Sequence, residues 1–307
     1  MLKITSIQAN CGDSFLIEDT ENSKTLLVDC GFKLTYKYKI KQLISSVDHL
    51  ILTHSDEDHI HGAIPLIEDT PVHFKVGKVY VNVPSSYDVA VDSGNISIHQ
   101  AITLENLLNL KAVPFQGLLA GETIDISENI TLEVISPSQE DLEYFISKYR
   151  EFTEDVESDP ISQTSPQIQL EELAERSDSY KPKKSDFTNT ASIAFVLKYK
   201  SYNLLFLGDA HPTVITDYLQ SKGYSDTKKY FFDYIKLSHH GSITSISKKL
   251  ISMISCSNFI VSTNGGKSRS LHPSRETLAK LALTVDRNES ESINFYFNYP
   301  IQDWSYP

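Results

Sequence analysis

The feature that most constrains the fold is a recurring pattern in which an apolar segment stops at side chains that can bind a metal ion. Residues 48–52 form such a segment, and the run His54-Ser55-Asp56-Glu57-Asp58-His59 follows it directly. Two more segments end in the same way: residues 203–207 before Asp209, and residues 234–237 before Ser238, His239 and His240. Short apolar runs bounded by turn residues predict buried strands. Because strand ends at one edge of a sheet bring distant side chains together, the pattern predicts one site at that edge.

Strands and helices are both predicted along the chain, beginning with three strands in a meander. Strands are predicted at residues 2–8, 14–18, 25–29, 48–52, 78–83, 123–126, 130–136, 191–199, 203–207, 234–237 and 259–262. Helical spacing occurs at residues 36–45, 62–68, 99–110 and 273–283.

The segment 139–187 differs in composition from the rest, being rich in Glu, Ser, Gln and Lys. It contains helical patterns near residues 140–152 and 167–176, joined by a weakly hydrophobic stretch. It has too few apolar residues to form a core of its own. We therefore predict a single domain over residues 1–307, with a helical, partly mobile insertion at about 139–187.

Charge and cysteine content narrow the classes of function. Asp plus Glu number 40 against 28 Lys plus Arg, giving a net charge of −12, which repels nucleic acid at long range. The three cysteines form no CxxC pair and no even set, which argues against a disulfide framework and a structural zinc knot. No apolar stretch reaches the length of a membrane helix, and no signal-peptide core follows Met1. We expect a soluble, cytoplasmic protein without a membrane partner.

The run from His54 to His59 offers two imidazoles and two carboxylates within six residues, all of which can bind divalent metals. A tight loop allows alternate members to face two neighbouring ions. The alternative is an acidic surface loop with incidental histidines, which this density of ligands after a buried strand disfavours. Glu57 is expected to face solvent.

Five separated motifs resemble those of metallo-β-lactamase-fold hydrolases and occur in the same order. The run from Thr53 to Gly62 resembles the HxHxDH signature, with Asp56 in place of the second His. The remaining motifs are Cys11-Gly12-Asp13-Ser14 with Leu27-Val28-Asp29-Cys30-Gly31, then Phe206-Leu207-Gly208-Asp209-Ala210, then Leu237-Ser238-His239-His240-Gly241-Ser242, then His272-Pro273-Ser274. This combination is most similar to the hydrolase domain of the DNA-uptake protein ComEC and its free-standing relatives. The resemblance implies an α/β fold with a four-layer αββα sandwich.

The resemblance also implies a site for two divalent ions, zinc or manganese. It places His54 and Asp56 on one ion, Asp58 and His59 on the other, and Asp209 between them. One of His239 and His240 completes the second ion's ligands, and His239 is preferred because it comes first after the strand. Many family members carry a further histidine before the bridging aspartate, but this chain has none between His99 and Asp209. Asn189 or a water fills that position, or the first ion binds weakly, and oxygen-rich ligation suits manganese or iron as well as zinc.

The reaction expected of such a site is phosphodiester hydrolysis, with DNA or RNA as the substrate. Two ions lower the pKa of a bridging water from about 15.7 toward about 7, so that hydroxide attacks at neutral pH. Asp58 is predicted to orient this nucleophile, and His272 to donate to a phosphate oxygen or leaving group. The alternatives are a hydrolase of small esters or cyclic nucleotides, and a catalytically degenerate protein that binds a partner through the 139–187 insertion.

Other polar residues receive weaker predictions. His61 and His211 lie close in sequence to ligands, and either a supporting or a structural role fits them. His49 is predicted to pack in the core, and His73 and His99 to lie at the surface. Five basic side chains could form a local positive patch that binds a polyanion, or they could be solvated surface charges. These residues are Lys181, Lys183, Lys184, Lys267 and Arg269.

Overall fold

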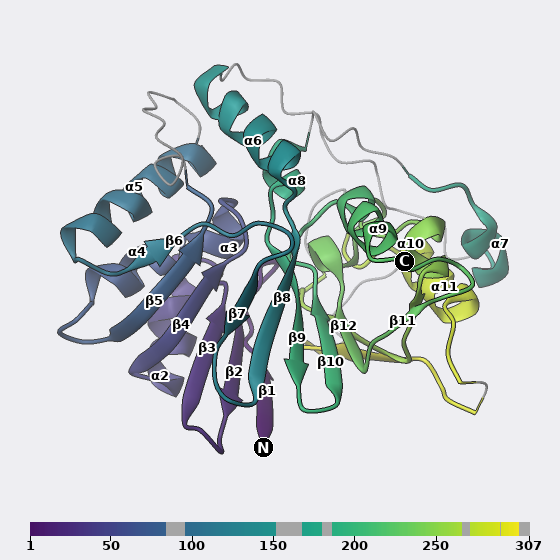
Figure 1. Cartoon of the computed structure of the whole chain (residues 1–307), viewed down its shortest axis with the longest axis horizontal. Helices are drawn as coiled ribbons and strands as arrows, with labels where there is room; N and C mark the ends of the chain where they lie inside the picture. Colours follow the sequence, from purple (N-terminus) through teal and green to yellow (C-terminus); the bar gives the residue numbers. More distant parts are fainter. Residues whose placement is uncertain (84–95, 152–167, 180–185, 266–270, 289, 301–307) are drawn as a thin grey trace.

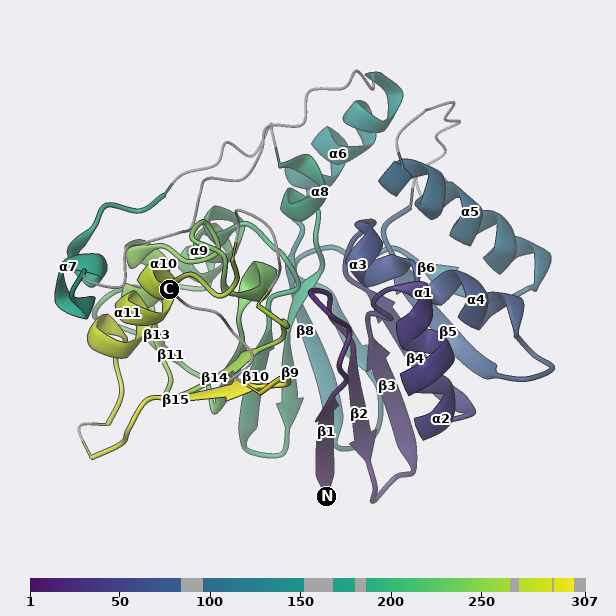
Figure 2. The ribbon, with the colours of Figure 1, turned by 180° about the vertical axis from the view of Figure 1, so that it is seen from behind.

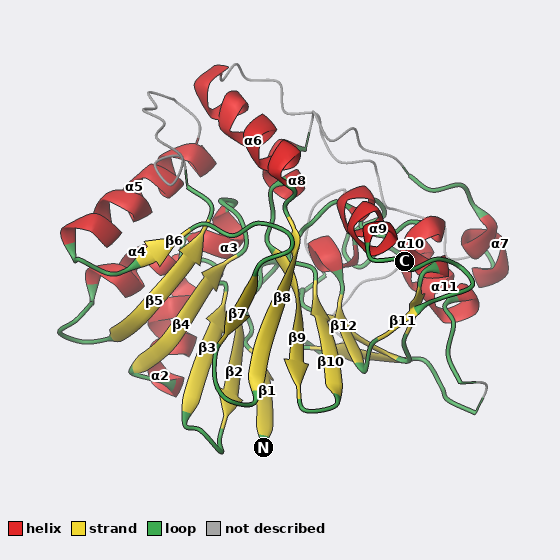
Figure 3. Cartoon of the chain, in the orientation of Figure 1, coloured by secondary structure: helices red, strands yellow, loops and turns green. Residues whose placement is uncertain are grey.

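Two β-sheets face each other in the computed structural model, with helices on the two outer sides (Figures 1 and 3). The structure describes residues 1–83, 96–151, 168–179, 186–265, 271–288 and 290–300.

The first sheet contains six strands in the order β1-β2-β3-β4-β5-β6. Their bounds are Leu2–Ser6, Phe15–Asp19, Lys24–Val28, Ser46–Leu52, Lys75–Val81 and Phe115–Gln116. Strands β1 to β3 pair antiparallel, and β3 to β6 pair parallel. Leu50, Ile51 and Leu52 of β4 are all fully buried, as expected of a central strand that is covered on both faces.

The second sheet contains seven strands in the order β15-β14-β12-β10-β9-β8-β7. In chain order their bounds are β7 Thr123–Asp125, β8 Ile130–Ser136, β9 Ala194–Tyr199, β10 Tyr202–Phe206, β12 Tyr234–Lys236, β14 Asn258–Val261 and β15 Asn294–Phe297. Strands β7 to β10 pair antiparallel and β10, β12, β14 and β15 pair parallel. A separate short pair joins β11 (Tyr230–Phe231) to β13 (Ile254–Ser255).

Helices cover the outer face of each sheet (Figure 2). On the first sheet lie α1 (Lys33–Thr35), η1 (Tyr36–Ile40), α2 (Lys41–Leu43), α4 (Ala63–Glu68) and α5 (Ile96–Leu110), and on the second lie α9 (Pro212–Ser221), α10 (Lys248–Ser252) and α11 (Arg275–Thr284). Ser247 and Ser274 cap the N-termini of α10 and α11 by accepting from backbone N–H groups of their first turns. His211 caps α9 in the same way, directly before Pro212.

Three apolar layers confirm the predicted αββα sandwich. Between the sheets, Phe15 packs edge-on against Phe206 at 5.7 Å between ring centroids. Outside the first sheet, Leu27 and Leu50 share a cluster with helix residues such as Leu104. Outside the second, a third cluster contains side chains of β9, β10 and β12 together with side chains of α9, α10 and α11. The alternation of inward and outward side chains along each strand separates the layers.

The insertion contributes more to the packing than its composition suggests. Leu142 and Phe145 of α6 (Gln139–Glu151) join the helix-side core of the first sheet. Leu173 of α7 (Leu170–Glu175) is fully buried in a cluster that includes Ala279 of α11. The two predicted helices are therefore present, and the described parts of the insertion pack on the sandwich. The predicted partial mobility of the insertion at about 139–187 stays a prediction, and its segments 152–167 and 180–185 lie outside the described residues.

The strand ends that carry the polar motifs meet at one end of the sandwich. Ile193, just before β9, donates its backbone N–H to the carbonyl of Thr53, 2.8 Å away, which joins the two sheets there. His239 donates its backbone N–H to the carbonyl of Gly208 at 3.1 Å. Helices α3 (Glu57–Ile60), α6 and α8 (Phe187–Thr190) lie at the same end in both views (Figures 1 and 2).

Candidate metal centre

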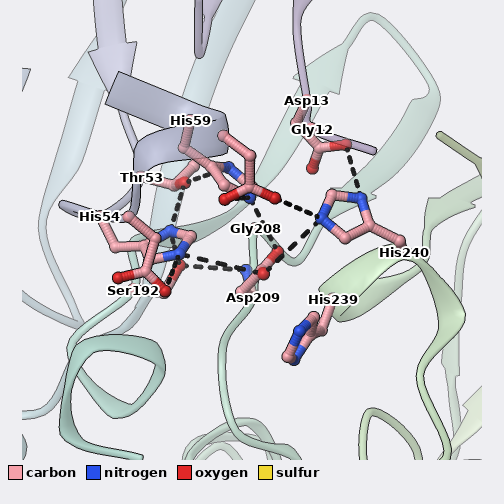
Figure 4. Close-up of polar contacts among 12 residues, drawn as sticks. Gly12, Asp13, Thr53, His54, His59, Ser192, Gly208, Asp209, His239 and His240 are labelled. Carbon is pink, nitrogen blue, oxygen red and sulfur yellow. Dashed lines mark hydrogen bonds and ion pairs between the residues drawn. The ribbon is translucent and has the colours of Figure 1, made fainter. Parts of the chain in front are cut away.

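Four segments deliver the candidate ligands to this end of the sandwich (Figure 4). His54 and Asp56 lie in the loop after β4, and α3 carries Asp58 and His59 one turn further on. The other ligands come from the second sheet: Asp209 after β10, and His240 in the turn Ser238–Gly241 after β12.

Asp209 lies at the centre of the cluster and faces three imidazoles. One carboxylate oxygen, Oδ1, is 3.5 Å from His59 Nε2, and Oδ2 is 3.9 Å from the Nε2 atoms of His54 and His240. Asp56 Oδ2 is 3.4 Å from His54 Nε2 on one side. Asp58 Oδ2 is 3.4 Å from His240 Nε2 on the other side. The geometry therefore contains two donor groups that share Asp209.

The Nδ1 atoms of the three histidines are held by acceptors, which leaves each Nε2 directed at the cluster. His240 Nδ1 donates to the backbone carbonyl of Ser262 at 2.8 Å, and His59 Nδ1 lies 2.8 Å from Asp29 Oδ2. Thr53 donates its hydroxyl to Asp29, so that its oxygen accepts from His54 Nδ1 at 3.0 Å. Supporting acceptors of this kind fix the tautomer and orientation of metal-binding imidazoles.

Carboxylates dominate the electrostatics of the cluster. Burial lowers the pKa of His240, but Asp13, Asp209 and Asp58 outweigh it and raise the pKa to about 10. Burial likewise lowers the pKa of His59, and Asp209 and Asp29 hold it well above its ordinary value. The pKa of Asp209 lies well below its usual range despite burial, since cationic imidazoles surround it. Such a group of buried carboxylates attracts cations.

The cluster fits divalent metal ions. His54 Nε2, His59 Nε2, His240 Nε2 and Asp209 Oδ1 are buried and have no hydrogen-bond partner within the described structure, which is costly for polar atoms. Two sets of residues have ligand atoms that all lie within 4.8 Å of one another within the set. The first set is His54, His59 and Asp209, and the second is Asp58, His59 and His240, so that His59 belongs to both. Ligands bound to a tetrahedral ion at about 2.1 Å lie about 3.4 Å apart, which agrees with the separations on both sides of Asp209.

The structure brings His240, not the preferred His239, to the second donor group. His239 is half-buried, and its Nδ1 accepts from the side-chain amide of Asn189 at 3.4 Å. Both histidines have left-handed backbone angles, with φ of 44° at His239 and 54° at His240. This turn directs the side chain of His240 into the cluster. The position of a histidine in the sequence after the strand does not show which of the two side chains points there.

Asn189 lies beside the cluster but engages its amide with the protein. Its Nδ2 donates to Asp186 Oδ1 at 3.0 Å, and its Oδ1 is buried without a hydrogen-bond partner among the described residues. Ser192, two residues before β9, lies nearer to the first donor group. Its hydroxyl accepts from the backbone N–H of Asp209 at 3.1 Å and is 3.5 Å from His54 Nδ1.

His272 lies next to the cluster without joining either donor group. Its ring centroid is 5.4 Å from that of His239 and 6.3 Å from that of His240. The backbone N–H of Ser274 donates to the carbonyl of Gly241 at 2.8 Å, which ties this loop to the histidine turn. His272 is thus positioned at the edge of the site.

The remaining histidines have structural surroundings. Half-buried His61 pairs with exposed Glu57 at 2.8 Å, and buried His211 caps α9. Half-buried His49 stacks on Tyr80. Exposed positions are found for His73 and His99, as predicted. The five residues of the predicted basic patch all lie outside the described residues: Lys181, Lys183, Lys184, Lys267 and Arg269.

Sequence reasoning assigned no role to three buried charges around the ligands. Asp29 accepts from Thr53 and His59, and Asp13 Oδ1 lies 3.4 Å from His240 Nδ1. Lys236, the last residue of β12, forms an ion pair with Asp13. The signal that could have found them was available, because Asp29 and Lys236 each stand at the end of an apolar strand.

Residues 12–119 match the Metallo-beta-lactamase superfamily. The matched span contains the run from His54 to His59 and ends before Asp209. No curated protein matches the sequence. The four-layer arrangement described above is consistent with the metallo-β-lactamase fold that this family model represents.

The chain is also similar to solved structures at low identity. One is the metallo-β-lactamase fold protein YhfI from Bacillus subtilis, with 13% identity, a TM-score of 0.45 and coverage of 96% of this chain and 98% of that chain. Another is CmlA, a diiron β-hydroxylase from Streptomyces venezuelae, with 12% identity, a TM-score of 0.45 and coverage of 94% of this chain and 48% of that chain. Among the described helices, none has the length and apolar character needed to cross a bilayer.

Proposed function

We propose that this protein is a metal-dependent phosphodiesterase that acts on DNA or RNA. The observation that carries the proposal is the convergence of three buried Nε2 atoms and two further carboxylates, those of Asp56 and Asp58, around the carboxylate of Asp209. The metallo-β-lactamase fold supports metal-dependent hydrolysis as a general class. The resemblance to ComEC-type hydrolase domains supports the phosphodiester substrate.

The ligands divide between two ions in the proposed centre. His54 and Asp56 would hold the first ion, Asp58, His59 and His240 would hold the second, and Asp209 could serve either. Two divalent ions in these positions supply a nucleophile at neutral pH and a Lewis acid for phosphate oxygens. Zinc and manganese both suit this mixture of imidazole and carboxylate ligands.

The chain's own residues define how a substrate approaches. The side chains of Asp56 and Asp58 are 33% and 27% exposed, whereas those of the other proposed ligands are at most 4% exposed. A substrate therefore meets the centre on the side of these two carboxylates. His59 and His240 hold the pKa of half-buried Asp58 at about 2 against the effect of burial, so that it stays ionised and can orient a water. His272, at the edge of the site, is positioned to donate to a phosphate oxygen or a leaving group.

The decisive experiment measures bound metal and cleavage in the same preparation. We expect about two ions per chain, with cleavage of single-stranded DNA, RNA or a generic phosphodiester that stops when a chelator is added. Asp209→Asn is expected to lower the cleavage rate by more than about 100-fold, because it removes the shared ligand. Asp217→Asn, on the exposed face of α9, is the matched control and should leave the rate unchanged. Cleavage that survives the chelator would contradict the proposal.

A hydrolase of small phosphate esters or cyclic nucleotides is the second candidate. The net charge of −12 favours it, since a small substrate meets less long-range repulsion than a polymer does. Comparing the rates on a cyclic nucleotide and on single-stranded DNA separates the two candidates. A partner bound through the 139–187 insertion also stays a prediction.

A further inference from the structure

Lys236 is a charged side chain in a place where lysine is rarely found. Its side chain is 2% exposed, at the end of central strand β12 and within the polar end of the sandwich. Lysines are almost never fully buried unless they are paired. The surroundings of this ammonium should therefore explain its position.

The ammonium contacts both halves of the sandwich. It forms an ion pair with Asp13, from the loop between β1 and β2, whose side chain is also 2% exposed. On the other side, Nζ donates to the backbone carbonyl of Gly208 at 2.9 Å and lies 3.9 Å from Asp209 Oδ1. A single cation thus links the first sheet to the segment that carries the shared ligand.

The partner of Lys236 belongs to a third group of metal-capable atoms. Ligand atoms of Asp13, Asp29 and His59 lie within 4.8 Å of one another, all buried, in the same kind of arrangement as the two proposed metal groups. This group is engaged by the protein itself: His59 Nδ1 pairs with Asp29 at 2.8 Å, and Asp13 pairs with Lys236.

We propose that the Lys236 ammonium is a fixed internal cation that takes the place of a metal ion in this third group. It limits the centre to two ions and keeps Asp13 beside His240, where Asp13 Oδ1 lies 3.4 Å from Nδ1. This inference rests on the proposed two-ion centre and adds how the number of ions is set.

The charges of the whole cluster agree with this role. Five carboxylates surround the centre: Asp13, Asp29, Asp56, Asp58 and Asp209. Two divalent ions and one ammonium would balance these five carboxylate charges before a hydroxide binds. Buried charges are tolerated when they are balanced and held at close range.

Counting bound ions tests the proposal. Lys236→Ala removes the ammonium and opens space beside Asp13, so we expect it to bind one more Mn²⁺ per chain than the wild type in equilibrium dialysis. Adding Asp13→Asn to this variant should remove the extra ion, because the third group then loses its carboxylate. An unchanged ion count in folded Lys236→Ala would overturn the proposal.

The count relative to the wild type separates this proposal from the proposed function. A wild type that binds no ion contradicts the two-ion centre, whereas an extra ion in Lys236→Ala would still support the assignment of Lys236. If the wild type and Lys236→Ala both bind two ions, the two-ion centre is supported and the proposed role of Lys236 is contradicted.

A second variant covers the case in which Lys236→Ala does not fold. Lys236→Met keeps the volume and removes the charge, which leaves buried Asp13 with His240 as its remaining partner. In metal-free protein we expect a melting temperature lower by roughly 5 to 10 °C, with at least half of the loss recovered in Lys236→Met/Asp13→Asn.

The matched control for this measurement is Lys198→Met. Lys198 pairs with Glu133 at 2.8 Å on the surface, with its side chain 44% exposed. Its loss should change the melting temperature by about 1 °C or less. A Lys236→Met protein as stable as this control would show that no buried charge depends on Lys236 and would overturn the proposal.

Discussion

Individual residues at the centre adopt backbone angles that most side chains avoid. Asp29, His239 and His240 all have positive φ, at 56°, 44° and 54°. Left-handed angles of this kind in residues other than glycine cost of the order of 1 kcal/mol each and persist where the surroundings enforce them. Gly12 meets a different constraint, because a Cβ at its position would lie 2.0 Å from the backbone oxygen of Asp58.

The two adjacent histidines give a prediction at the residue scale. His240→Ala removes a proposed ligand of the second ion, so we expect the variant to bind about one ion fewer per chain. Its activity should fall by more than the roughly 10- to 100-fold loss that is typical when a residue supporting a ligand is changed. His239→Ala should keep both ions, because its Nδ1 faces Asn189 instead. Elemental analysis of the two purified variants measures the difference.

Either variant serves as the control for the other, since the two residues are neighbours in one turn. Loss of an ion in His239→Ala, with both ions kept in His240→Ala, would show that His239 and not His240 binds the second ion. Equal losses in both variants would indicate that the turn as a whole, and not one imidazole, holds the second ion.

At the scale of elements, the second helix of the insertion is attached to the sandwich through α11. Arg275 donates from Nη2 to the carbonyl of Ile168 at 3.1 Å. Lys280, only 1% exposed, pairs with Glu276 at 2.9 Å and with Asp178 at 3.0 Å. Buried Lys280 therefore joins exposed Asp178, in residues 168–179, to the helix that follows His272.

Removing the Lys280 cation should detach α7. Lys280→Met leaves Glu276, itself 3% exposed, without its closest partner. Breaking one side of a buried pair costs about 3–5 kcal/mol, so we expect a loss of that order in urea unfolding and faster proteolysis near residues 168–179. Lys249→Met, an exposed lysine of α10, is the control and should change neither quantity. Unchanged stability in Lys280→Met would contradict the role of Lys280.

At the scale of the whole molecule, polar contacts join the two sheets at both ends of the sandwich. Lys236 and Asp13 do so near the metal centre. At the opposite end, Asp19 of β2 accepts from the hydroxyl of Ser127, 2.6 Å away in the turn between β7 and β8. Its carboxylate also accepts from the side chain and backbone of Asn22.

The contact at the far end should make stability depend on pH. Burial raises the pKa of Asp19, but the hydrogen bonds from Ser127 and Asn22 outweigh it and lower the pKa from 3.8 to about 2. A carboxylate whose pKa is lower in the folded state than in the unfolded state stabilises the folded protein. This contribution is complete above about pH 4, the unfolded pKa, and is lost as the pH falls through about 2, the folded pKa. We expect Asp19→Asn to cost about 1–2 kcal/mol at pH 7 and about half as much at pH 3, because pH 3 lies between the folded and unfolded pKa values.

Urea unfolding of both proteins at the two pH values measures this effect. Asp125→Asn, an exposed carboxylate of β7 on the same turn, is the control and should show no such dependence. A cost in Asp19→Asn that is the same at pH 7 and pH 3 would show that its charge is not the stabilising feature.

The sequence by itself determined most strands to within a few residues and the run from His54 to His59, while the fold class came from the order of its motifs. The strands and this run are local features, because apolar periodicity and turn residues specify strands, and closely spaced ligands must share one loop. It also determined that the segments ending at Asp209 and at His239–His240 bear on the same site, through their position after strands.

Only the tertiary structure decided which atoms meet. The left-handed turn reverses the expected order of His239 and His240, and no local pattern encodes that reversal. The position of Lys236 after an apolar strand could have suggested a role, but its pairing with Asp13 arises only when the two sheets close. The insertion is too polar to form a core alone, yet Leu173 is buried against α11, because burial depends on surfaces that folding brings together from distant parts of the chain.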